Sequence, residues 1–480
     1  MTGSVTPPIP RDRRLPLALL CAAVLMAIVD ETVVSVALPA IQRDLGFATD
    51  DLSWIVNAYL AGFGGLLLLS GRIGDLVGRK TVLLAGLSLF VLASGLCGAA
   101  PSSAWLVAGR FVQGVGGGMA GAVALGMVVA LFDDPRLQAR GIAVYSFVGA
   151  AGASIGFFAG GLICDLAGWR WVFFINIPIG VVTVLAGGRV LAGERGPGLR
   201  AGADAAGAVL LVTGTMLAIV AIVDAHLRGL GVAAVVLLAL FAVRQATAAH
   251  PLLPLGLLRS RAVAGANAAL ALTVGAMFGF QFLVALYFQR VLGYSPAQAG
   301  AAVLPTAVGI GVVSLAGFPR VSRRRGPRGA LLSGLAAIAA GLALLTRVPV
   351  EGAYAADVLP SLLLFGVGGG LTIPAVMTIA MSEATPPTAG VSSGLITTSQ
   401  QVGGALGLAL LAALAAGRTG DLRAAGAAQD AAMVGGLHLA WAVAAGLVLA
   451  ALLIAAAVLR APGRRPAAVP PRVRACIGDR

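Results

Sequence analysis

Long apolar runs separated by short polar stretches fill almost the whole sequence. A run of about 20 apolar residues is long enough to cross a bilayer as one helix. The pattern therefore predicts an all-α polytopic membrane protein with 14 transmembrane helices. The expected spans are residues 15–38, 52–70, 81–99, 104–130, 141–163, 171–192, 205–223, 229–243, 262–288, 298–318, 329–346, 356–380, 389–416 and 433–459.

Two short polar turns suggest that the chain contains an internal repeat. "GRIGDLVGRK" follows the second expected span and "GFPRVSRRRGPR" follows the tenth, and both turns are basic and bounded by glycine. Transporter folds are often built from such repeats. We expect one six-helix bundle over 15–192 and a second over 262–459, with two inserted helices and their flanking loops in 193–261. Residues 1–14 and 460–480 are then tails.

The composition agrees with a membrane protein. The chain is 59% hydrophobic and 11% charged, whereas a soluble domain is about 25% charged. With the N-terminus inside, 25 of the 33 Lys and Arg residues fall in cytoplasmic segments and seven fall outside. Cytoplasmic loops of membrane proteins carry this excess. We therefore expect a bacterial cytoplasmic (inner) membrane protein with both termini in the cytoplasm, and the net charge of +14 does not indicate a nucleic-acid partner.

Two adjacent acids interrupt the first apolar run, "LCAAVLMAIVDETVVSVALPA". A charge at the middle of a span costs about 2.5–3.5 kcal/mol, so Asp30 and Glu31 are candidates for function. Arg110 lies within the fourth span and needs a partner, because an unpaired buried charge is very costly. We expect Asp30 to bind and release a proton, with Arg110 across a cavity from it. The alternative for both acids is a structural ion pair.

Several function classes lack the residues they would need. A phosphate-binding loop requires lysine after glycine, and the single lysine, Lys80, follows Arg79. An enzyme site would need a nucleophile with its base or a metal cluster, but His226, His250 and His438 stand alone. No filter-like loop or ring of charge indicates a channel. We expect a protein that is not an enzyme, with no cofactor and no metal, powered by the proton gradient.

The turn "GRIGDLVGRK" resembles the signature turn of the major facilitator superfamily. It matches that turn at Gly71, Asp75, Gly78, Arg79 and Lys80. Asp75 and Arg79 are four residues apart and can pair on a helical turn. The resemblance implies a gating latch that stabilises one of two access states. An ordinary basic turn is the alternative.

Further motifs resemble the fourteen-span drug/proton antiporter branch of that superfamily. "LVAGRFVQGVGGG" resembles the family's second motif and carries Arg110, Gln113 and Gly114. "DETVVSVALP" resembles the branch's pattern around the first-span acid, which favours Asp30 over Glu31. "AGWRWVFFINIPIG", "YFQRVLGYSPAQAGAAVLP" and "GLITTSQQVGGALGLAL" also resemble sequences of this branch.

The fifth span contains a glycine stripe, "GASIGFFAGG". Gly152, Gly156 and Gly160 lie four residues apart, and Gly161 follows. Such stripes allow helices to pack closely. The spacing resembles the family's antiporter motif, although Phe157 stands where that motif usually has proline. Packing without a role in coupling is the alternative.

A substrate pocket is the weakest of these predictions, because aromatic residues in spans also pack or lie at interfaces. The glutamines cannot titrate and could instead bridge helices. The candidate pocket residues are Trp54, Asn57, Tyr59, Gln113, Phe278, Gln281, Phe282 and Gln400.

The sequence as a whole predicts a proton-coupled exporter of lipophilic drugs or toxic natural products that works by alternating access as a monomer. No acid lies deep in the last six expected spans, so neutral or singly charged substrates fit best. The alternatives are a facilitator or importer of a small organic solute on the same fold, or a non-transporting membrane sensor.

Overall fold

The computed structural model describes most of the chain between residues 9 and 458. The described residues are 9–48, 50–132, 134–193, 196, 198, 204–223, 227, 229–248, 251–252, 256, 259–380 and 389–458. The predicted tails therefore lie largely outside the described residues.

The described residues form helices joined by short turns, with no strand among them. The helices are α1 Arg11–Leu45, α2 Trp54–Val77, α3 Arg79–Gly98, α4 Ser103–Ala130, α5 Pro135–Ala167, α6 Trp171–Phe174, α7 Asn176–Val190, α8 Ala205–Val223, α9 Leu230–Thr247, α10 Arg261–Leu286, α11 Pro296–Val312, α12 Phe318–Leu345, α13 Leu359–Ala380, α14 Ala389–Ala424 and α15 Gln429–Val458. Short π-helical segments, η5 Tyr287–Val291 and η6 Val313–Gly317, extend α10 and α11, and η7 Tyr354–Val358 precedes α13.

The all-helical membrane fold is confirmed, and the count of 14 spans stays a prediction. In the described residues, 12 helices are long and apolar enough to cross a membrane. One of them, Pro296–Leu345, runs through 50 residues and covers two expected spans. Within it, Gly326 has a φ of 71°, which breaks the helix between the two passes. Among the described residues of α5, Phe158–Ala167 is an apolar stretch too short to cross a membrane alone.

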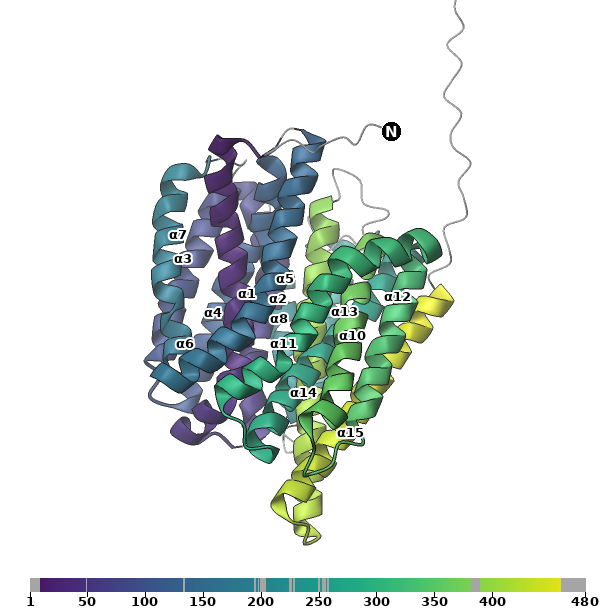
Figure 1. The fold of residues 1–480 in the computed structure, drawn as a ribbon. Helices are drawn as coiled ribbons and strands as arrows, with labels where there is room; N and C mark the ends of the chain where they lie inside the picture. The colour runs from purple at the N-terminus through teal and green to yellow at the C-terminus, as the bar shows by residue number, and fades with distance from the viewer. Residues whose placement is uncertain are drawn as a thin grey trace, which may run out of the picture.

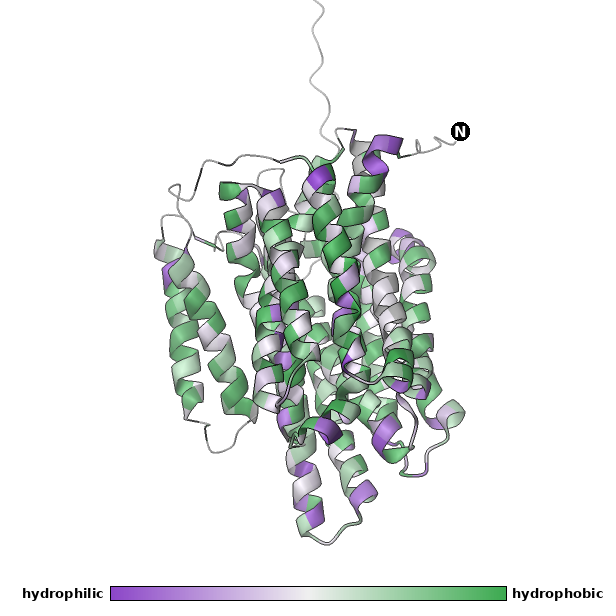
Figure 2. Ribbon diagram, turned by 90° about the vertical axis from the view of Figure 1, so that its left-hand side faces the viewer, coloured by the Kyte–Doolittle hydropathy of each residue, from purple (hydrophilic) through white to green (hydrophobic). Residues whose placement is uncertain are grey.

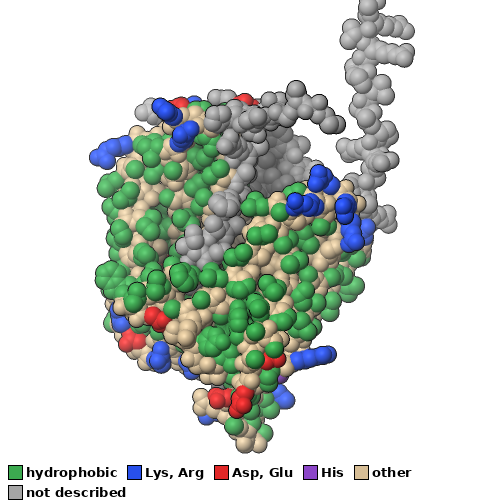
Figure 3. Space-filling view, viewed as in Figure 1, with side chains coloured by type: hydrophobic (Ala, Val, Ile, Leu, Met, Phe, Trp, Pro, Cys, Tyr) green, Lys and Arg blue, Asp and Glu red, His purple; other side chains and the backbone are tan. Residues whose placement is uncertain are grey.

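The helices stand side by side in two bundles (Figure 1). Helices α1–α7 form one bundle and α10–α15 form the other, and α1 begins at the same end of the molecule at which α15 ends (Figure 1). We call this the termini-bearing end. Apolar side chains cover the sides of the molecule, whereas Lys, Arg, Asp and Glu gather at its two ends (Figure 3). This distribution suits a bilayer around the middle.

Helices α8 and α9 pack beside the two bundles as a separate pair (Figure 2). Leu68 of α2, Ala208 of α8 and Leu395 of α14 share one buried cluster, so α8 covers the seam between the bundles. Asp204 joins the pair, because it accepts hydrogen bonds from the backbone N–H of Gly207 and from the side chains of Arg244 and Gln245.

Asp204 lies just before α8 and is almost fully buried. Burial alone raises its pKa, but the hydrogen bonds from Gly207, Arg244 and Gln245 outweigh burial and leave the pKa below its usual value. The carboxylate is thus held in its charged form at the end of the inserted pair.

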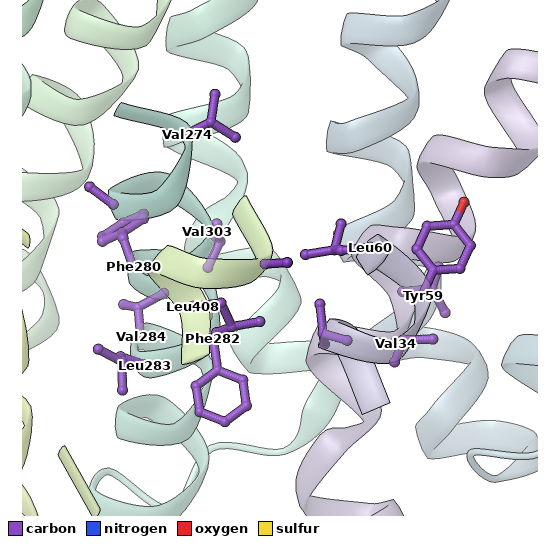
Figure 4. Packing of buried hydrophobic residues seen from close by; sticks show 14 of the residues in the cluster. Val34, Tyr59, Leu60, Val274, Phe280, Phe282, Leu283, Val284, Val303 and Leu408 are labelled. Carbon is purple, nitrogen blue, oxygen red and sulfur yellow. The ribbon is translucent and has the colours of Figure 1, made fainter. Parts of the chain in front are cut away.

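A continuous apolar core joins the two bundles. Val34 and Leu60 of the first bundle face Phe282 and Leu408 of the second in Figure 4, and all four belong to one buried cluster. The polar groups described next lie inside the first bundle, away from this apolar seam.

Candidate functional site

Asp30 lies near the middle of α1, and its side chain is fully buried. Its Oδ2 accepts a hydrogen bond from Nη1 of Arg110 at 2.5 Å. Its Oδ1 accepts from Nε2 of Gln113 and from Nδ2 of Asn176, both at 2.8 Å. Helices α4 and α7 therefore supply three donors to one carboxylate. Bonds of this kind stabilise the ionised form of an acid.

Arg110 is equally enclosed. Its Nε donates to the carbonyl oxygen of Ile55 at 3.0 Å and its Nη1 donates to Oε1 of Gln113 at 2.6 Å. The guanidinium carbon lies 4.3 Å from the centre of the Tyr59 ring, a cation–π geometry. Nη2 is buried and has no hydrogen-bond partner among the described residues. Arg110 thus links α1, α2 and α4.

The prediction of a cavity between Asp30 and Arg110 is wrong, because the two side chains touch and neither is exposed. The reason is a close approach of α2 and α4. A Cβ added to Gly114 would lie 2.1 Å from the carbonyl oxygen of Tyr59. Only glycine allows this approach, which places the guanidinium against the carbonyl of Ile55.

Glu31 is the neighbouring acid, and its situation differs from that of Asp30. The residue is half-buried, and its Oε1 is buried without a hydrogen-bond partner. No ion pair involves Glu31 in the described part of the chain, since the nearby Arg110 is bonded to Asp30. Successive residues on a helix point about 100° apart. Glu31 and Asp30 therefore project in different directions from α1, and only Asp30 forms an ion pair with Arg110.

The Gly71 to Lys80 turn lies at the termini-bearing end of the first bundle. Nε and Nη2 of Arg79 donate to Oδ1 of Asp75 at 3.2 and 3.0 Å, and both side chains are exposed. Gly78 ends α2 with a φ of 104°, a conformation that favours glycine. Gly71 is half-buried.

Lys80 fastens this turn to the end of α7. Its Nζ donates to the carbonyl oxygens of Gly188 at 2.9 Å and Leu191 at 2.7 Å. A cation at the carboxyl end of a helix is favourable, because unpaired carbonyl groups point outward there. These bonds hold the turn within the first bundle.

The glycine stripe of α5 packs against α1. A Cβ added to Gly156 would lie 1.8 Å from Oγ1 of Thr32, and one added to Gly160 would lie 2.8 Å from Cα of Val33. One added to Gly152 would also crowd α1, at 2.9 Å from a methyl group of Leu25. The stripe therefore brings α5 into close contact with the helix that carries Asp30.

Gly161 faces the second bundle instead. A Cβ added there would lie 2.3 Å from the carbonyl oxygen of Pro296, at the start of α11. The two faces of α5 thus contact both bundles through glycine. The side chain of Phe157 lies outside the described residues.

Asp165, one turn beyond Gly161, bonds to the first turn of α11. Its Oδ2 accepts from Oγ of Ser295 at 2.8 Å and from the backbone N–H of Ala297 at 3.0 Å. A carboxylate is favourable at a helix N-terminus, because free N–H groups and the positive end of the helix dipole lie there.

Two further hydrogen bonds join the bundles near this point. Nε2 of Gln289 donates to the carbonyl oxygen of Val36 at 2.9 Å, and the guanidinium of Arg290 donates to Oε1 of Gln42. Like the Asp165 bonds, they lie at the end opposite the termini (Figure 1). We call this group of contacts the far-end closure.

The candidate pocket residues lie in different surroundings. Tyr59 and Gln113 belong to the buried Asp30 network, and Phe282 packs in the core. Asn57 is fully buried, and neither of its amide atoms has a partner among the described residues. The half-buried members of the set are Trp54, Phe278, Gln281 and Gln400.

Sequence reasoning missed two members of the network. Asn176 donates to Asp30, and Ser94 accepts a hydrogen bond from Gln113 at 2.8 Å. The sequence could have indicated Asn176, because it is the one strongly polar residue in the motif "FFINIPIG". Among the described residues, no group of three or more His, Cys, Asp or Glu side chains could hold a metal ion.

Comparison with known proteins places this geometry in context. The model of the Major Facilitator Superfamily matches residues 20–408. The puromycin resistance protein of Streptomyces alboniger is 35% identical, and the match covers 92% of this chain and 89% of that protein. The cephamycin export protein of Amycolatopsis lactamdurans is 36% identical over 82% of this chain and 83% of its own. The tetracenomycin C resistance and export protein of Streptomyces glaucescens is 33% identical over 88% and 83%.

Solved structures share the fold at low sequence identity. A bacterial homologue of the human lysosomal transporter Spinster, in an inward-facing and unoccupied conformation, superposes with a TM-score of 0.70. It is 16% identical, and the match covers 95% of this chain and 100% of that one. The POT family transporter PepTSo also gives a TM-score of 0.70 at 16% identity, over 95% and 98% of the two chains.

Proposed function

The chain belongs to the major facilitator superfamily, and from this premise we propose that it is a proton-coupled exporter of lipophilic antibiotics or related toxic natural products. It is a transporter and not an enzyme. Three of its relatives are named for resistance to, or export of, puromycin, cephamycin and tetracenomycin C. These compounds are the first substrates to test.

The buried Asp30 network is the observation that carries the proton-coupling part of the proposal. A proton on Asp30 would remove the counter-charge of Arg110, and an uncompensated buried charge is strongly destabilising. Protonation therefore has to be accompanied by a rearrangement among the helices that meet at Arg110. In the described state, Asp30 accepts three hydrogen bonds, one of them from Arg110.

We propose that Glu31 passes protons between water and this network, and that its Oε1, which is buried in this state, reaches water in the other state. It is half-buried and lacks a partner, whereas Asp30 is fully enclosed. In our proposal a proton reaches Glu31 first and passes to Asp30 when α1 turns. Glu31 is thus an accessory acid, and Asp30 is the proton carrier that governs Arg110.

Alternating access follows from contacts that cannot all persist. The far-end closure holds the two bundles together opposite the termini. We propose that the termini-bearing end faces the cytoplasm of a bacterial inner membrane and that this structure corresponds to the state closed to the outside. Drug and proton need not touch each other, because each can bias the same equilibrium between two states.

One chain contains every member of the Asp30 network, so we propose that the monomer is the working unit. Asp30, Arg110 and Asn176 come from α1, α4 and α7 of the same bundle. No residue from a second copy is needed to satisfy the carboxylate.

A whole-cell assay tests the direction of transport. Expression in a drug-sensitive bacterium should lower the retained amount of at least one of the three antibiotics, and an uncoupler that collapses the proton gradient should restore it. Increased retention would instead indicate an importer. Unchanged retention of every compound, with the protein present in the membrane, would favour a non-transporting sensor.

A further inference from the structure

The first part of α12, which forms the basic turn between two expected spans, concentrates positive charge at the termini-bearing end of the second bundle. Within residues 318–328 it contains five arginines and no acid, and Glu351 is the next acid along the chain. Blue side chains gather at this corner in Figure 3. The arginines are Arg320, Arg323, Arg324, Arg325 and Arg328.

No acid neutralises these arginines in the described part of the chain. Arg320 donates to the carbonyl oxygen of Ala316, and Arg328 donates to the carbonyl oxygen of Ala456. None of the five forms an ion pair among the described residues. The corresponding turn of the first bundle differs, since Asp75 there pairs with Arg79.

Three of the arginines share one recess. Arg320, Arg323 and Arg324, together with Val321, line a half-open depression of about 340 Å³ on the surface. Ligand sites generally measure about 300–1,000 Å³, so the recess can accept a phosphate with its adjoining glycerol. Like charges that converge on one space repel each other unless an anion lies between them.

The backbone holds this arrangement in place. Gly326 has a φ of 71°, and Pro327 follows it, so the helical turn that carries Arg320 and Arg324 ends abruptly before the rest of α12. Without that break, α12 would continue straight and carry its arginines around all sides of the helix. The break keeps the charge on a short separate turn.

We propose that this recess binds the phosphate of an anionic phospholipid headgroup, such as phosphatidylglycerol or cardiolipin. The turn joins two helices that cross the membrane, so it lies at the level of the headgroups. Basic pockets between spans on the cytoplasmic side bind such lipids. The arginine fork also suits the paired oxygens of a phosphodiester, and Val321 gives the recess an apolar wall.

This inference is independent of the drug and of proton coupling. It concerns the bilayer that surrounds the protein, and an exporter, an importer or a sensor on this fold would all carry the site. It also differs from the general excess of charge in cytoplasmic loops, which sets orientation but requires no shaped cavity.

Lipid binding to the purified full-length protein tests the proposal. The measurement is native mass spectrometry with phosphatidylglycerol or phosphatidylcholine added at matched concentrations. The parent should retain phosphatidylglycerol in preference to phosphatidylcholine. The triple variant R320Q/R323Q/R324Q should lose about tenfold or more in affinity for phosphatidylglycerol, because three charge-assisted contacts are removed.

Two matched variants separate a shaped site from simple charge. R320K/R323K/R324K keeps the charge that sets topology but lacks the planar fork, so its affinity should fall between those of the parent and the glutamine variant. R418Q/R423Q removes two exposed arginines near the opposite end, and it should bind like the parent. Equal binding by the parent and the glutamine variant would overturn the proposal, as would equal losses in the glutamine and control variants.

A competition arm distinguishes a lipid from a soluble anion. Inorganic phosphate and glycerol 3-phosphate, each added in large excess, should leave the phosphatidylglycerol complex intact. Displacement of the lipid by inorganic phosphate alone would make the recess a soluble-phosphate site, and the lipid assignment would then be wrong.

Discussion

At the residue scale, one fully buried ion pair organises the first bundle. Asp30 and Arg110 have no exposed surface, and each also bonds to polar groups on other helices. A pair of this kind adds little stability compared with apolar packing, but the loss of one partner is costly. That asymmetry makes the pair suitable as a switch that responds to a single proton.

The first prediction concerns stability. Arg110→Gln leaves Asp30 charged and unpaired, and it should lower the free energy of unfolding by about 3–5 kcal/mol. Thermal unfolding of the purified protein in detergent measures the loss as a lower melting temperature. The double variant D30N/R110Q removes both charges and should recover most of the lost stability while remaining unable to pump. If R110Q melts like the parent, the pair does not hold the bundle together.

Part of this site could be predicted from sequence. The cost of burying a charge identified Asp30 and Arg110 as partners, because an acid and an arginine in two apolar spans need each other. Asn176 and Ser94 could not be identified in the same way, since neutral polar residues occur in spans for many reasons. Their role depends on how α3 and α7 pack around α1.

At the element scale, α5 is the helix that links the two bundles through glycine. Gly156 and Gly160 lie against α1, and Gly161 lies against the start of α11. Helices that touch through glycine pack well at only one interhelical distance, because closely packed interiors do not deform continuously. A small shift of α5 would therefore disturb both the Asp30 helix and the far-end closure.

The second prediction tests that link. In Gly161→Ala the new Cβ would clash with the backbone of Pro296, which no side-chain rotation relieves. The far-end closure should open more often. In a chain that also carries Cys476→Ser, the thiol introduced by Ser295→Cys should then react faster with a membrane-impermeant maleimide in intact cells. Gly188→Ala is the matched control, because no atom lies within 4 Å of its new Cβ. Equal labelling rates for the Gly161 variant and the control would show that α5 does not control closure.

Helix boundaries were the hardest feature to predict. The expected span 171–192 is divided into α6 and α7 at Ile175, and two other expected spans merge in the stretch from Pro296 to Leu345. Hydropathy measures length and apolarity, and it does not register the change of backbone conformation at Gly326. Tertiary packing decides where such a helix bends.

At the scale of the whole molecule, the distribution of charge should determine the orientation of the two bundles across the membrane. Helix α1 begins and α15 ends at one end of the bundles, where the arginine-rich turn of the second bundle also lies (Figures 1 and 3). By the positive-inside rule, we propose that this end faces the cytoplasm. Orientation follows from the sum of many weak preferences and not from a single residue.

The third prediction concerns topology. A green fluorescent protein fused after Arg480 should fluoresce, and alkaline phosphatase fused at the same point should be inactive, because we propose that the C-terminus is cytoplasmic. Phosphatase fused at Leu227, between α8 and α9, should be active if the inserted pair spans the membrane, as the fourteen-span prediction requires. An inactive Leu227 fusion, in protein that reaches the membrane, would mean that the pair does not cross and that the count of 14 is wrong.

Proton-driven drug transport is the central claim. Drug uptake into inverted membrane vesicles under an imposed pH gradient measures it most directly. With an acidic lumen, vesicles containing the parent should accumulate the antibiotic selected by the whole-cell assay, and the lumen should become less acidic as the drug enters. Asp30→Asn should abolish both signals while the variant still binds the drug. Glu31→Gln, one residue away, should slow both signals without abolishing them. Undiminished drug accumulation and proton release by Asp30→Asn would contradict the account.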